Sequence, residues 1–584
     1  MPAVERENPG RAELQLGHDS ASPPLARLLG ELFPHHPQAL PILARLARAE
    51  RLGHTGLVLA AADAGQLTSL AEQTEDPHTP LVLDGDWLAS RRAWTHERNL
   101  ARDLLARANT PFSVDHDPAL GADIAAAFPP SARALSEQGT DWQRTAATVA
   151  LHHGLTLITG GPGCGKTAVA GRIALLLAQH HARSKRPVPT VVLAAPTGKA
   201  AGRLVESVRR ELSRSALDPA VQAELTAWST TLHRLFHDPR CPRVDLAIID
   251  ETSMASAATL ARVLARIPAT ARVLLLGDPD QLASVEPGRV LADLAHLPAA
   301  HPIAPRVVRL RVNWRSGEAP ALAALVKALQ HDDPTAPRLL DTPPPNPADA
   351  TPWIHRTDLP THPATLIQRL GADHRDWLDR LAQAPDPAAA LALSTEVRLL
   401  TVLRQGSWGA DALNAQWERH LLNTWQIRAD AHGHFPGRLL LVTGNRPDLN
   451  LANGDVGIVW PESAADHAPW TTFFPDVGGV RAVPLHRLDG VIPAWFLTVH
   501  KAQGSQGDLV EVIGLPGDAN SGQRQLATRE MAYTAITRAA RRLRVWWDAP
   551  GLTQALATRE SQRRISGFPI HLAREAGRKA CPPA

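Results

Sequence analysis

The sequence is poor in cysteine, tyrosine and methionine: its 584 residues include three cysteines, one tyrosine and three methionines. Cys164, Cys241 and Cys581 are far apart and form no CxxC pair, which excludes a disulfide framework and a cysteine-based zinc site. No apolar run approaches the roughly 20 residues of a membrane-spanning helix, and the first residues mix both charge signs without an apolar stretch behind them. We therefore expect a cytoplasmic protein with no membrane span and no secretion signal.

The rest of the composition is that of a folded protein with several domains. Hydrophobic residues make up 44% and charged residues 20% of the chain, which argues against disorder, a coiled coil or collagen. The length is several times the ~100–200 residues of a typical domain, so about two to four domains are expected. A net charge of +3 and a pI near 9.0 favour a polyanionic partner only weakly.

Prolines and apolar runs predict the organisation of the chain. Consecutive prolines at 129 and 130 interrupt the helical patterns of the first part. The unbroken apolar runs LTLIT, VVLAA, LAIID and RVLLLG that follow are typical of buried parallel strands in an α/β sheet. A second α/β pattern begins after the Pro-rich stretch 334–352 and is interrupted by short strands with Asn-Gly and Asp-Gly turns. The predicted domains are a mainly helical one at 1–128, α/β domains at 129–340 and 341–584, and a small β domain inserted at about 435–497.

A phosphate-binding loop lies between the first apolar run and the helical pattern after it. The segment fits G-x-x-x-x-G-K-[ST] and consists of Gly160, Gly161, Pro162, Gly163, Cys164, Gly165, Lys166 and Thr167. Glycines let the backbone N–H groups and the helix N-terminus face phosphate oxygens. Lys166 is expected to reach the terminal phosphates, and the Thr167 hydroxyl is expected to bind Mg²⁺.

Polar residues follow two further apolar runs and complete a candidate hydrolytic site. Asp250 and Glu251 end LAIID, at the sheet edge where ligands of such folds bind. Asp250 can hold Mg²⁺ through water, and Glu251 can orient and deprotonate an attacking water. Gln281 follows RVLLLG and can contact the γ-phosphate or the lytic water. Upstream, the amide of Gln143 can both donate to and accept from an adenine edge.

An ordered set of segments resembles the helicase motifs of superfamily 1. The segments are TGGPGCGKT, APTGKAAGRL, TLHRLF, IIDETSM, LLGDPDQLASVEPGRVLADL, NWRSG, LTVHKAQGSQGDLV and ATREMAYTAITRAARRLRV. Within that superfamily the chain is most similar to the RecD family, the alpha subunits of the bacterial RecBCD enzyme, or exodeoxyribonuclease V. TREMAYTAITRA, TVLRQGSWGADALNAQWE, NLANGDVGIV and PLVLDGDWL support this likeness.

The resemblance implies a fold, an activity and partners. It implies a P-loop NTPase with two RecA-like parallel-sheet domains that close on ATP, and an SH3-like β domain inserted in the second. The implied activity is ATP-dependent DNA unwinding with 5′-to-3′ movement, as part of a heterotrimer with RecB and RecC that processes double-strand breaks. The N-terminal domain would then dock on RecC. No carboxylate–lysine pattern of a nuclease is found in the sequence, so DNA cleavage is expected of a partner.

The same resemblance assigns arginines to the nucleotide and several residues to single-stranded DNA. Arg538 is expected to act as an arginine finger across the cleft, with Arg315 as a second candidate. DNA contacts are expected from Thr197, Lys199, His233, Thr498, His500 and Gln503. Trp314 is a further stacking candidate, although a tryptophan is more often part of a core. Gln506 stands where relatives usually carry an acidic residue, which puts ribose selectivity in doubt.

Three alternatives stay open at this point. A regulatory subunit with a vestigial ATPase is disfavoured by the intact set of catalytic residue types. A small-molecule P-loop kinase or GTPase is disfavoured because it needs neither of the motif segments after residue 490. A free-standing helicase without RecB and RecC partners is the nearest alternative.

Overall fold

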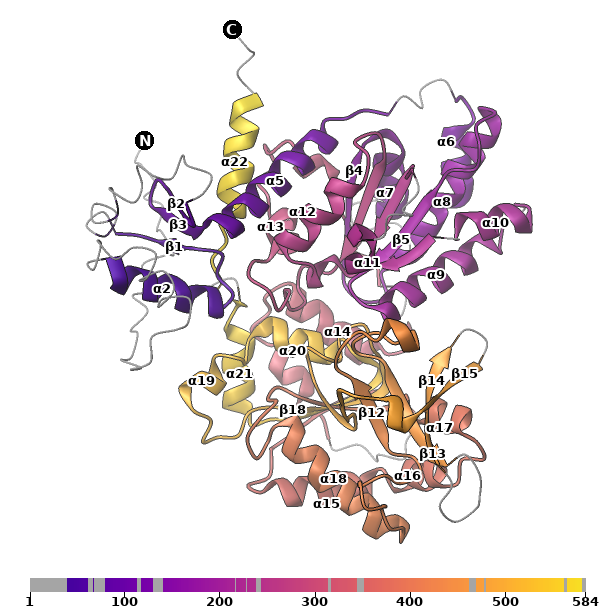
Figure 1. Cartoon of the computed structure of the whole chain (residues 1–584), viewed down its shortest axis with the longest axis vertical. Helices are drawn as coiled ribbons and strands as arrows, with labels where there is room; N and C mark the ends of the chain where they lie inside the picture. Colours follow the sequence, from indigo (N-terminus) through magenta and orange to yellow (C-terminus); the bar gives the residue numbers. More distant parts are fainter. Residues whose placement is uncertain are drawn as a thin grey trace.

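The computed structural model describes residues 39–579 except for 61–62, 64–66, 68–78, 113–116, 130–139, 216, 227, 238–242, 314–316, 344–350, 462–468, 477–478 and 561–563. Two parallel sheets dominate it, and in Figure 1 the first lies above the second. An antiparallel sheet is inserted in the second half, and a small sheet stands at the N-terminal side. No helix among the described residues is long and apolar enough to cross a membrane.

The four apolar runs that the sequence predicts as strands form the inner strands β5, β7, β8 and β4 of the first parallel sheet, and β6 and β9, which were not predicted, form its edges. Its order is β6-β5-β7-β8-β4-β9, and every pair is parallel. The strands are β4 (Leu155–Thr159), β5 (Val191–Ala195), β6 (Trp228–Thr231), β7 (Leu246–Ile249), β8 (Arg272–Gly277) and β9 (Val307–Arg309). Apolar side chains on both faces require helices on both faces, because neither face can be left to water.

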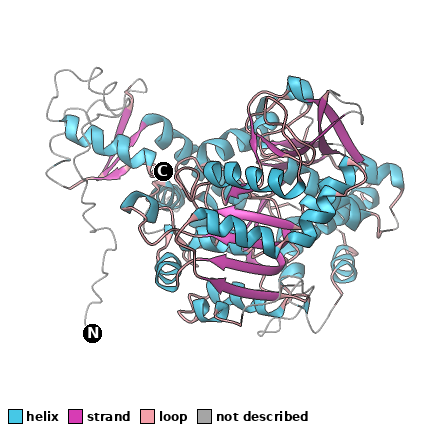
Figure 2. Cartoon of the chain, turned by 90° about the horizontal axis from the view of Figure 1, so that it is seen from below, coloured by secondary structure: helices cyan, strands magenta, loops and turns pink. Residues whose placement is uncertain are grey.

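Those helices form two layers. One face is covered by α7 (Trp142–His152), α8 (Lys166–Arg183) and α9 (Gly198–Leu212), whose apolar residues form one core with the sheet. The other face packs against α5 (Arg91–Ala108), α11 (Leu232–His237), α12 (Ala257–Arg266), α13 (Val290–Ala295) and α22 (Phe568–Lys579). Figure 2 shows strands with helices on either side.

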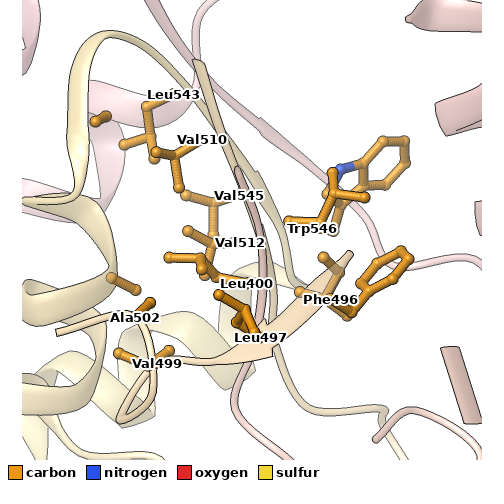
Figure 3. Packing of buried hydrophobic residues seen from close by; sticks show 14 of the residues in the cluster. Leu400, Phe496, Leu497, Val499, Ala502, Val510, Val512, Leu543, Val545 and Trp546 are labelled. Atoms are coloured by element: carbon orange, nitrogen blue, oxygen red, sulfur yellow. The ribbon is translucent and has the colours of Figure 1, made fainter. Parts of the chain in front are cut away.

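The second parallel sheet has the order β10-β19-β18-β11-β17. Its strands are β10 (Trp353–Thr357), β11 (Val397–Thr401), β17 (Phe496–Thr498), β18 (Gly507–Ile513) and β19 (Ala539–Trp546). Figure 3 shows their buried side chains, among them Leu400, Phe496 and Val512, packed in one cluster. The surrounding helices are α14 (Pro320–Gln330), α15 (Pro363–Asp373), α16 (Arg375–Ala382), α17 (Pro387–Ser394), α18 (Ala410–Trp425), α19 (Ser521–Arg524), α20 (Arg529–Ile536) and α21 (Ala549–Ala557).

The inserted sheet is antiparallel throughout and has the order β15-β14-β13-β12-β16. Its strands are β12 (Leu439–Val442), β13 (Val456–Pro461), β14 (Trp470–Asp476), β15 (Gly479–Pro484) and β16 (Val491–Pro493). The predicted fold class, two parallel α/β sheets with a small inserted β unit, is thereby confirmed.

The N-terminal part differs from the prediction in one element. The sequence predicts a mainly helical domain at 1–128, but the segment PLVLDGDWL within it forms a hairpin of β2 (Leu81–Asp84) and β3 (Trp87–Ser90). Gly85, with φ of +69°, supplies the left-handed residue of the two-residue turn. β1 (Leu57–Val58) pairs with β3, α2 (Leu40–Arg51) packs on this sheet, and α6 (Leu120–Ala127) follows α5.

Candidate nucleotide-binding site

The loop between β4 and α8 has the backbone that a phosphate cradle requires. Gly160, Gly163 and Gly165 have φ angles of 152°, 79° and 83°, values that residues with a Cβ rarely adopt. A Cβ at Gly160 would lie 2.7 Å from the carbonyl oxygen of Leu310, so only glycine fits there. The Lys166 ammonium donates to the carbonyl oxygens of Gly160 at 2.7 Å and Gly161 at 3.1 Å. A flexible cation is thus already located at the mouth of the loop, beside Thr167 at the start of α8.

Gln143 reaches the same loop from α7. Its Nε2 donates to the carbonyl oxygen of Cys164 at 3.3 Å, while Asp141 caps the helix by accepting from the amide of Gln143 at 3.0 Å. Cys164 is buried, and this burial raises the pKa of its thiol. Pro162 of the loop lines a cleft. The opposite wall of this cleft is formed by residues of α14 and by Thr537, Ala539 and Ala540. The phosphate loop therefore faces the junction of the two sheets.

Asp250 and Glu251 lie at the carboxyl end of β7, next to this loop. Burial raises the pKa of Asp250 to about 7, with the charge of Glu251 acting in the same direction and that of Lys166 against it. Glu251 has a φ of 51°, and its amide donates to Asp250 Oδ1 at 2.8 Å. A non-glycine residue in the left-handed region is unfavourable and is most often found at functional sites. The donor set is that of a Mg²⁺ site, because carboxylate and hydroxyl oxygens are the ligands this cation prefers.

Asp278 is a site residue that sequence reasoning missed, although Gln281 beside it was predicted. Both lie in the turn after β8, with 1% and 7% of their surface exposed. Gln281 Nε2 donates to Asp278 Oδ2 at 3.1 Å. Burial raises the pKa of Asp278 to about 6, and the charge of Lys166 acts against this rise. The available signal was a second aspartate at a strand end, which alone is too common to single out.

Arg538 comes from the second sheet and lies among the acidic residues of the first. It is 3% exposed, and its guanidinium donates to the carbonyl oxygens of Thr534 at 3.0 Å and Ser505 at 3.5 Å and to the Thr537 hydroxyl at 3.3 Å. Burial lowers the pKa of Arg538, while the charges of Glu251 and Asp278 raise it. The structure thus brings Arg538 together with the predicted residues of the first sheet. Arg315 and Trp314 lie outside the described residues.

The residues predicted to contact DNA divide into two groups. At the start of α9, the Thr197 hydroxyl accepts from the amide of Ala200 at 3.2 Å, and burial together with Arg398 and Arg203 lowers the pKa of Lys199 to about 7. His233 is exposed on α11.

The other group makes contacts inside the protein. Gln503 Nε2 donates to the carbonyl oxygen of Leu282 at 3.4 Å, and buried Thr498 accepts from the amide of Lys501 at 3.4 Å. Burial lowers the pKa of His500, with the charge of Arg564 in support. Gln503 therefore bonds across the junction between the two sheets, whereas the Thr498 contact is local to the turn after β17.

Comparisons with known proteins place the motifs in two families. Residues 138–342 match the AAA domain and residues 493–546 match the UvrD-like helicase C-terminal domain. The chain is 36% identical to the RecBCD enzyme subunit RecD of Mycolicibacterium smegmatis over 80% of this chain and 79% of that protein. It is 34% identical to the RecBCD enzyme subunit RecD of Mycobacterium tuberculosis, covering 85% and 82%. The ATP-dependent RecD2 DNA helicase of Deinococcus radiodurans is 30% identical over 66% of this chain and 46% of that protein.

Proposed function

The chain belongs to the RecD family and is an ATP-dependent DNA helicase, and from this membership we propose that it is the motor subunit alpha of an exodeoxyribonuclease V complex. In that role it works in the cytoplasm with RecB and RecC subunits and moves 5′ to 3′ on single-stranded DNA from a duplex end. The observation that supports the proposal is that Lys166 lies on the phosphate loop of the first sheet, while Arg538 of the second half is close enough for the charges of Glu251 and Asp278 to raise its pKa.

Each residue of this cleft has a definite role in hydrolysis. Lys166 leaves the loop carbonyls for the terminal phosphates, and Thr167 and Asp250 hold Mg²⁺, whose charge offsets the cost of the buried Asp250 carboxylate. Glu251 orients the attacking water and accepts its proton. Arg538 stabilises the charge on the transferring phosphoryl group, and because it comes from the second sheet, the cleft must close for it to act.

Cycles of closing and opening move DNA because the strand is held on both sheets. Thr197 and Lys199 lie at the start of α9 on the first sheet, whereas His500 follows β17 of the second. We assign the DNA phosphates to the first group, where positive charge and helix N-terminal amides are available, and to Thr498, His500 and Gln503 on the second sheet. The bond of Gln503 to the carbonyl oxygen of Leu282 joins the two halves and changes as the cleft closes.

The subunit assignment is supported by the lengths of the relatives. The matched region spans 79% of the Mycolicibacterium RecD subunit but 46% of the free-standing Deinococcus helicase. The N-terminal sheet with α2 and α5 is accordingly proposed as the part that docks on RecC. We propose 1–128, 129–340 and 341–584 as the domains along the sequence, with α14 packing on the second sheet and α22 on the first. A free-standing helicase is the second candidate, because RecD2 is also a relative.

The first prediction tests the motor. Lys166→Gln removes the cation that binds the terminal phosphates, so DNA-stimulated ATP hydrolysis should fall by roughly a hundredfold or more. Unwinding of partial duplexes with a 5′ single-stranded tail should be lost with it, while duplexes with a 3′ tail should be inactive even with the unchanged chain. Lys185→Gln, in the exposed turn after the same helix, is the matched control and should behave like the unchanged chain. Unwinding by the Lys166 variant at the normal rate would refute the proposal.

The partner assignment is tested by co-expression. The chain, its Lys166→Gln variant and the RecB and RecC proteins of the same genome are purified together and analysed by size-exclusion chromatography. Both forms of the chain should elute in a complex of three different subunits, because α8, which begins at Lys166, and the N-terminal sheet lie on opposite sides of the first parallel sheet (Figure 1). Elution of the chain alone, with unwinding activity intact, would favour the free-standing helicase instead.

A further inference from the structure

The only tyrosine of the chain, Tyr533, lies at the centre of the junction between the two sheets. It is on α20 of the second half, is 1% exposed, and its hydroxyl donates to Oδ2 of Asp278 at 3.0 Å. The same hydroxyl oxygen accepts from Gln330 Nε2, on α14, at 3.0 Å. The buried hydroxyl thus has both a donor and an acceptor partner, and the chain of hydrogen bonds that it joins is fully satisfied.

The hydroxyl of Tyr533 shares its acceptor with the predicted γ-phosphate sensor. Gln281 Nε2 donates to the same Asp278 Oδ2, at 3.1 Å. One carboxylate oxygen therefore holds a side chain from each half of the molecule. The Tyr533 hydroxyl also stabilises the charged form of Asp278, against the burial that raises the pKa of this carboxyl to about 6. Loss of that bond would weaken the acceptor that orients Gln281.

This chain of hydrogen bonds lies directly on the phosphate loop. A Cβ added at Gly161 would come within 2.7 Å of Gln330 Nε2 and 3.1 Å of the Tyr533 hydroxyl oxygen. A second contact stands beside it, because the amide of Leu282 donates to the Thr534 hydroxyl at 2.9 Å. Any movement of α20 relative to the loop after β8 must change both contacts.

We propose that Tyr533 is the positioning residue through which α20 sets the orientation of Gln281, so that the sensor takes its working position only when the two sheets are correctly placed. Tyr533 touches neither nucleotide nor DNA in this role, and acts through Asp278. The inference rests on the proposed hydrolytic role of the cleft and adds the means by which the second half controls it. It assigns a role to a residue that the mechanism above does not use.

A double-mutant cycle on ATP hydrolysis tests the proposal. Tyr533→Phe keeps the ring and removes the hydroxyl, so kcat for DNA-stimulated hydrolysis should fall roughly tenfold, the loss expected for one hydrogen bond to a charged group, with KM for ATP changed less than about twofold. Gln281→Ala should lower kcat at least as much. If Tyr533 acts through Gln281, adding Tyr533→Phe to Gln281→Ala should cause no further loss.

The matched control is Thr534→Val, which removes another buried hydroxyl of the same helix and junction. Its effect should add to that of Gln281→Ala, because its partner is the backbone of Leu282 and not Asp278. Additivity between Tyr533→Phe and Gln281→Ala, or an unchanged kcat for either single variant, would overturn the proposal. Loss of hydrolysis in Lys166→Gln tests the site itself, so the two failures are distinguishable.

The single tyrosine also provides a direct readout. Growth with 3-fluorotyrosine places one fluorine label in the whole chain, at position 533, and gives one ¹⁹F resonance. Addition of Mg²⁺ with the non-hydrolysable analogue AMP-PNP should shift this resonance, and the shift should be smaller in Asp278→Asn, which weakens the acceptor. Binding of AMP-PNP, confirmed by calorimetry, without any shift of the resonance would overturn the proposal while leaving the proposed function standing.

Discussion

At the scale of single residues, Arg538 is the group whose chemistry is most sharply constrained. Its guanidinium donates hydrogen bonds to two carbonyl oxygens and one hydroxyl, and the negative charges of Glu251 and Asp278 raise its pKa. A lysine keeps the positive charge but presents one compact ammonium in place of the planar fork. Arg538→Lys should therefore lower kcat for ATP hydrolysis by at least about a hundredfold, with KM for ATP little changed. Steady-state kinetics with saturating single-stranded DNA measure this.

Arg542→Lys is the control for Arg538→Lys. Arg542 lies on β19, shortly after Arg538, and its guanidinium forms an ion pair with Asp508 at 2.7 Å, away from the phosphate loop. This variant should keep hydrolysis within about twofold of the unchanged chain, because a partly exposed ion pair contributes about 1 kcal/mol or less. Equal losses in both variants would mean that Arg538 only supports the strand.

Residue-scale prediction from the sequence extends furthest where the residues of a site are contiguous. The phosphate loop is read from consecutive residues between a strand and a helix, and the acidic pair is read from the end of one apolar run. The role of Tyr533 could not be read in this way, because Asp278 and Tyr533 are 255 positions apart and meet only through the tertiary fold. Gln503 shows the same limit, since its partner Leu282 is 221 positions away in the sequence.

At the scale of elements, α5 carries a buried carboxyl group that makes its packing depend on pH. Glu97 is 1% exposed and accepts from the Ser566 hydroxyl at 3.0 Å, where the chain returns toward α22. Burial raises the pKa of Glu97 from 4.5 to about 7, and the charge of Asp293 on α13 adds to this rise. His54 also faces this contact, and burial lowers its pKa.

The sign of the pH effect follows from the raised pKa of Glu97. Protonation is easier in the folded state, so this contribution to stability is complete below pH of about 4.5 and is lost as the pH rises through about 7. Glu97→Gln removes this pH dependence. As the pH rises from 5 to 8, the free energy of opening the contact between α5 and α22 should therefore fall by roughly 2 kcal/mol more in the unchanged chain than in the variant. Hydrogen exchange of residues 568–579, corrected for the intrinsic pH dependence of exchange, measures this difference.

The opposite dependence expected of His54 is present in both chains and cancels in that comparison. Ser566→Ala is a second variant, which removes the hydroxyl that stabilises the charged form of Glu97, and it should steepen the loss of protection at high pH. Identical pH profiles for the unchanged chain and Glu97→Gln would contradict the prediction.

Strands and helices were largely predictable because their signals are local. Continuous apolar runs predicted the four inner strands of the first sheet but not its edge strands β6 and β9, and the turn pairs predicted the inserted sheet. The β2–β3 hairpin was missed because its turn, formed by Gly85 and Asp86, lies within one apolar segment, where a single strand and a hairpin have the same composition. The packing of α5 against α22 was also missed, because the apolar periodicity of a helix does not indicate which distant helix it contacts (Figure 1).

At the scale of the whole molecule, the two sheets are joined by contacts that the sequence could not predict. The turn after β8 contacts α20 through Asp278 and Leu282, and Arg203 on α9 donates to the carbonyl oxygen of Gly504. A Cβ added at Gly198, at the start of α9, would lie 3.0 Å from the Cβ of Ala452 in the inserted unit. This last distance is shorter than the roughly 3.5–4.5 Å that separates the Cβ atoms of a disulfide, so the two segments must move apart by about half an ångström to hold one. The backbone of Gly198 has no positive φ that a side chain would strain.

A Gly198→Cys and Ala452→Cys chain should therefore form a reversible cross-link between the first sheet and the inserted unit. If translocation needs these parts to move against each other, the oxidised form should lose at least about tenfold of its DNA unwinding rate, because closure and opening are then blocked. A reducing agent should restore the rate, and each single cysteine variant should be insensitive to oxidant, which controls for the buried thiol of Cys164. Binding of AMP-PNP should persist in the oxidised form, since the phosphate loop is untouched. Full unwinding by a chain shown to be cross-linked would mean that α9 and the inserted unit move as one body, and the moving junction would then have to lie at α20.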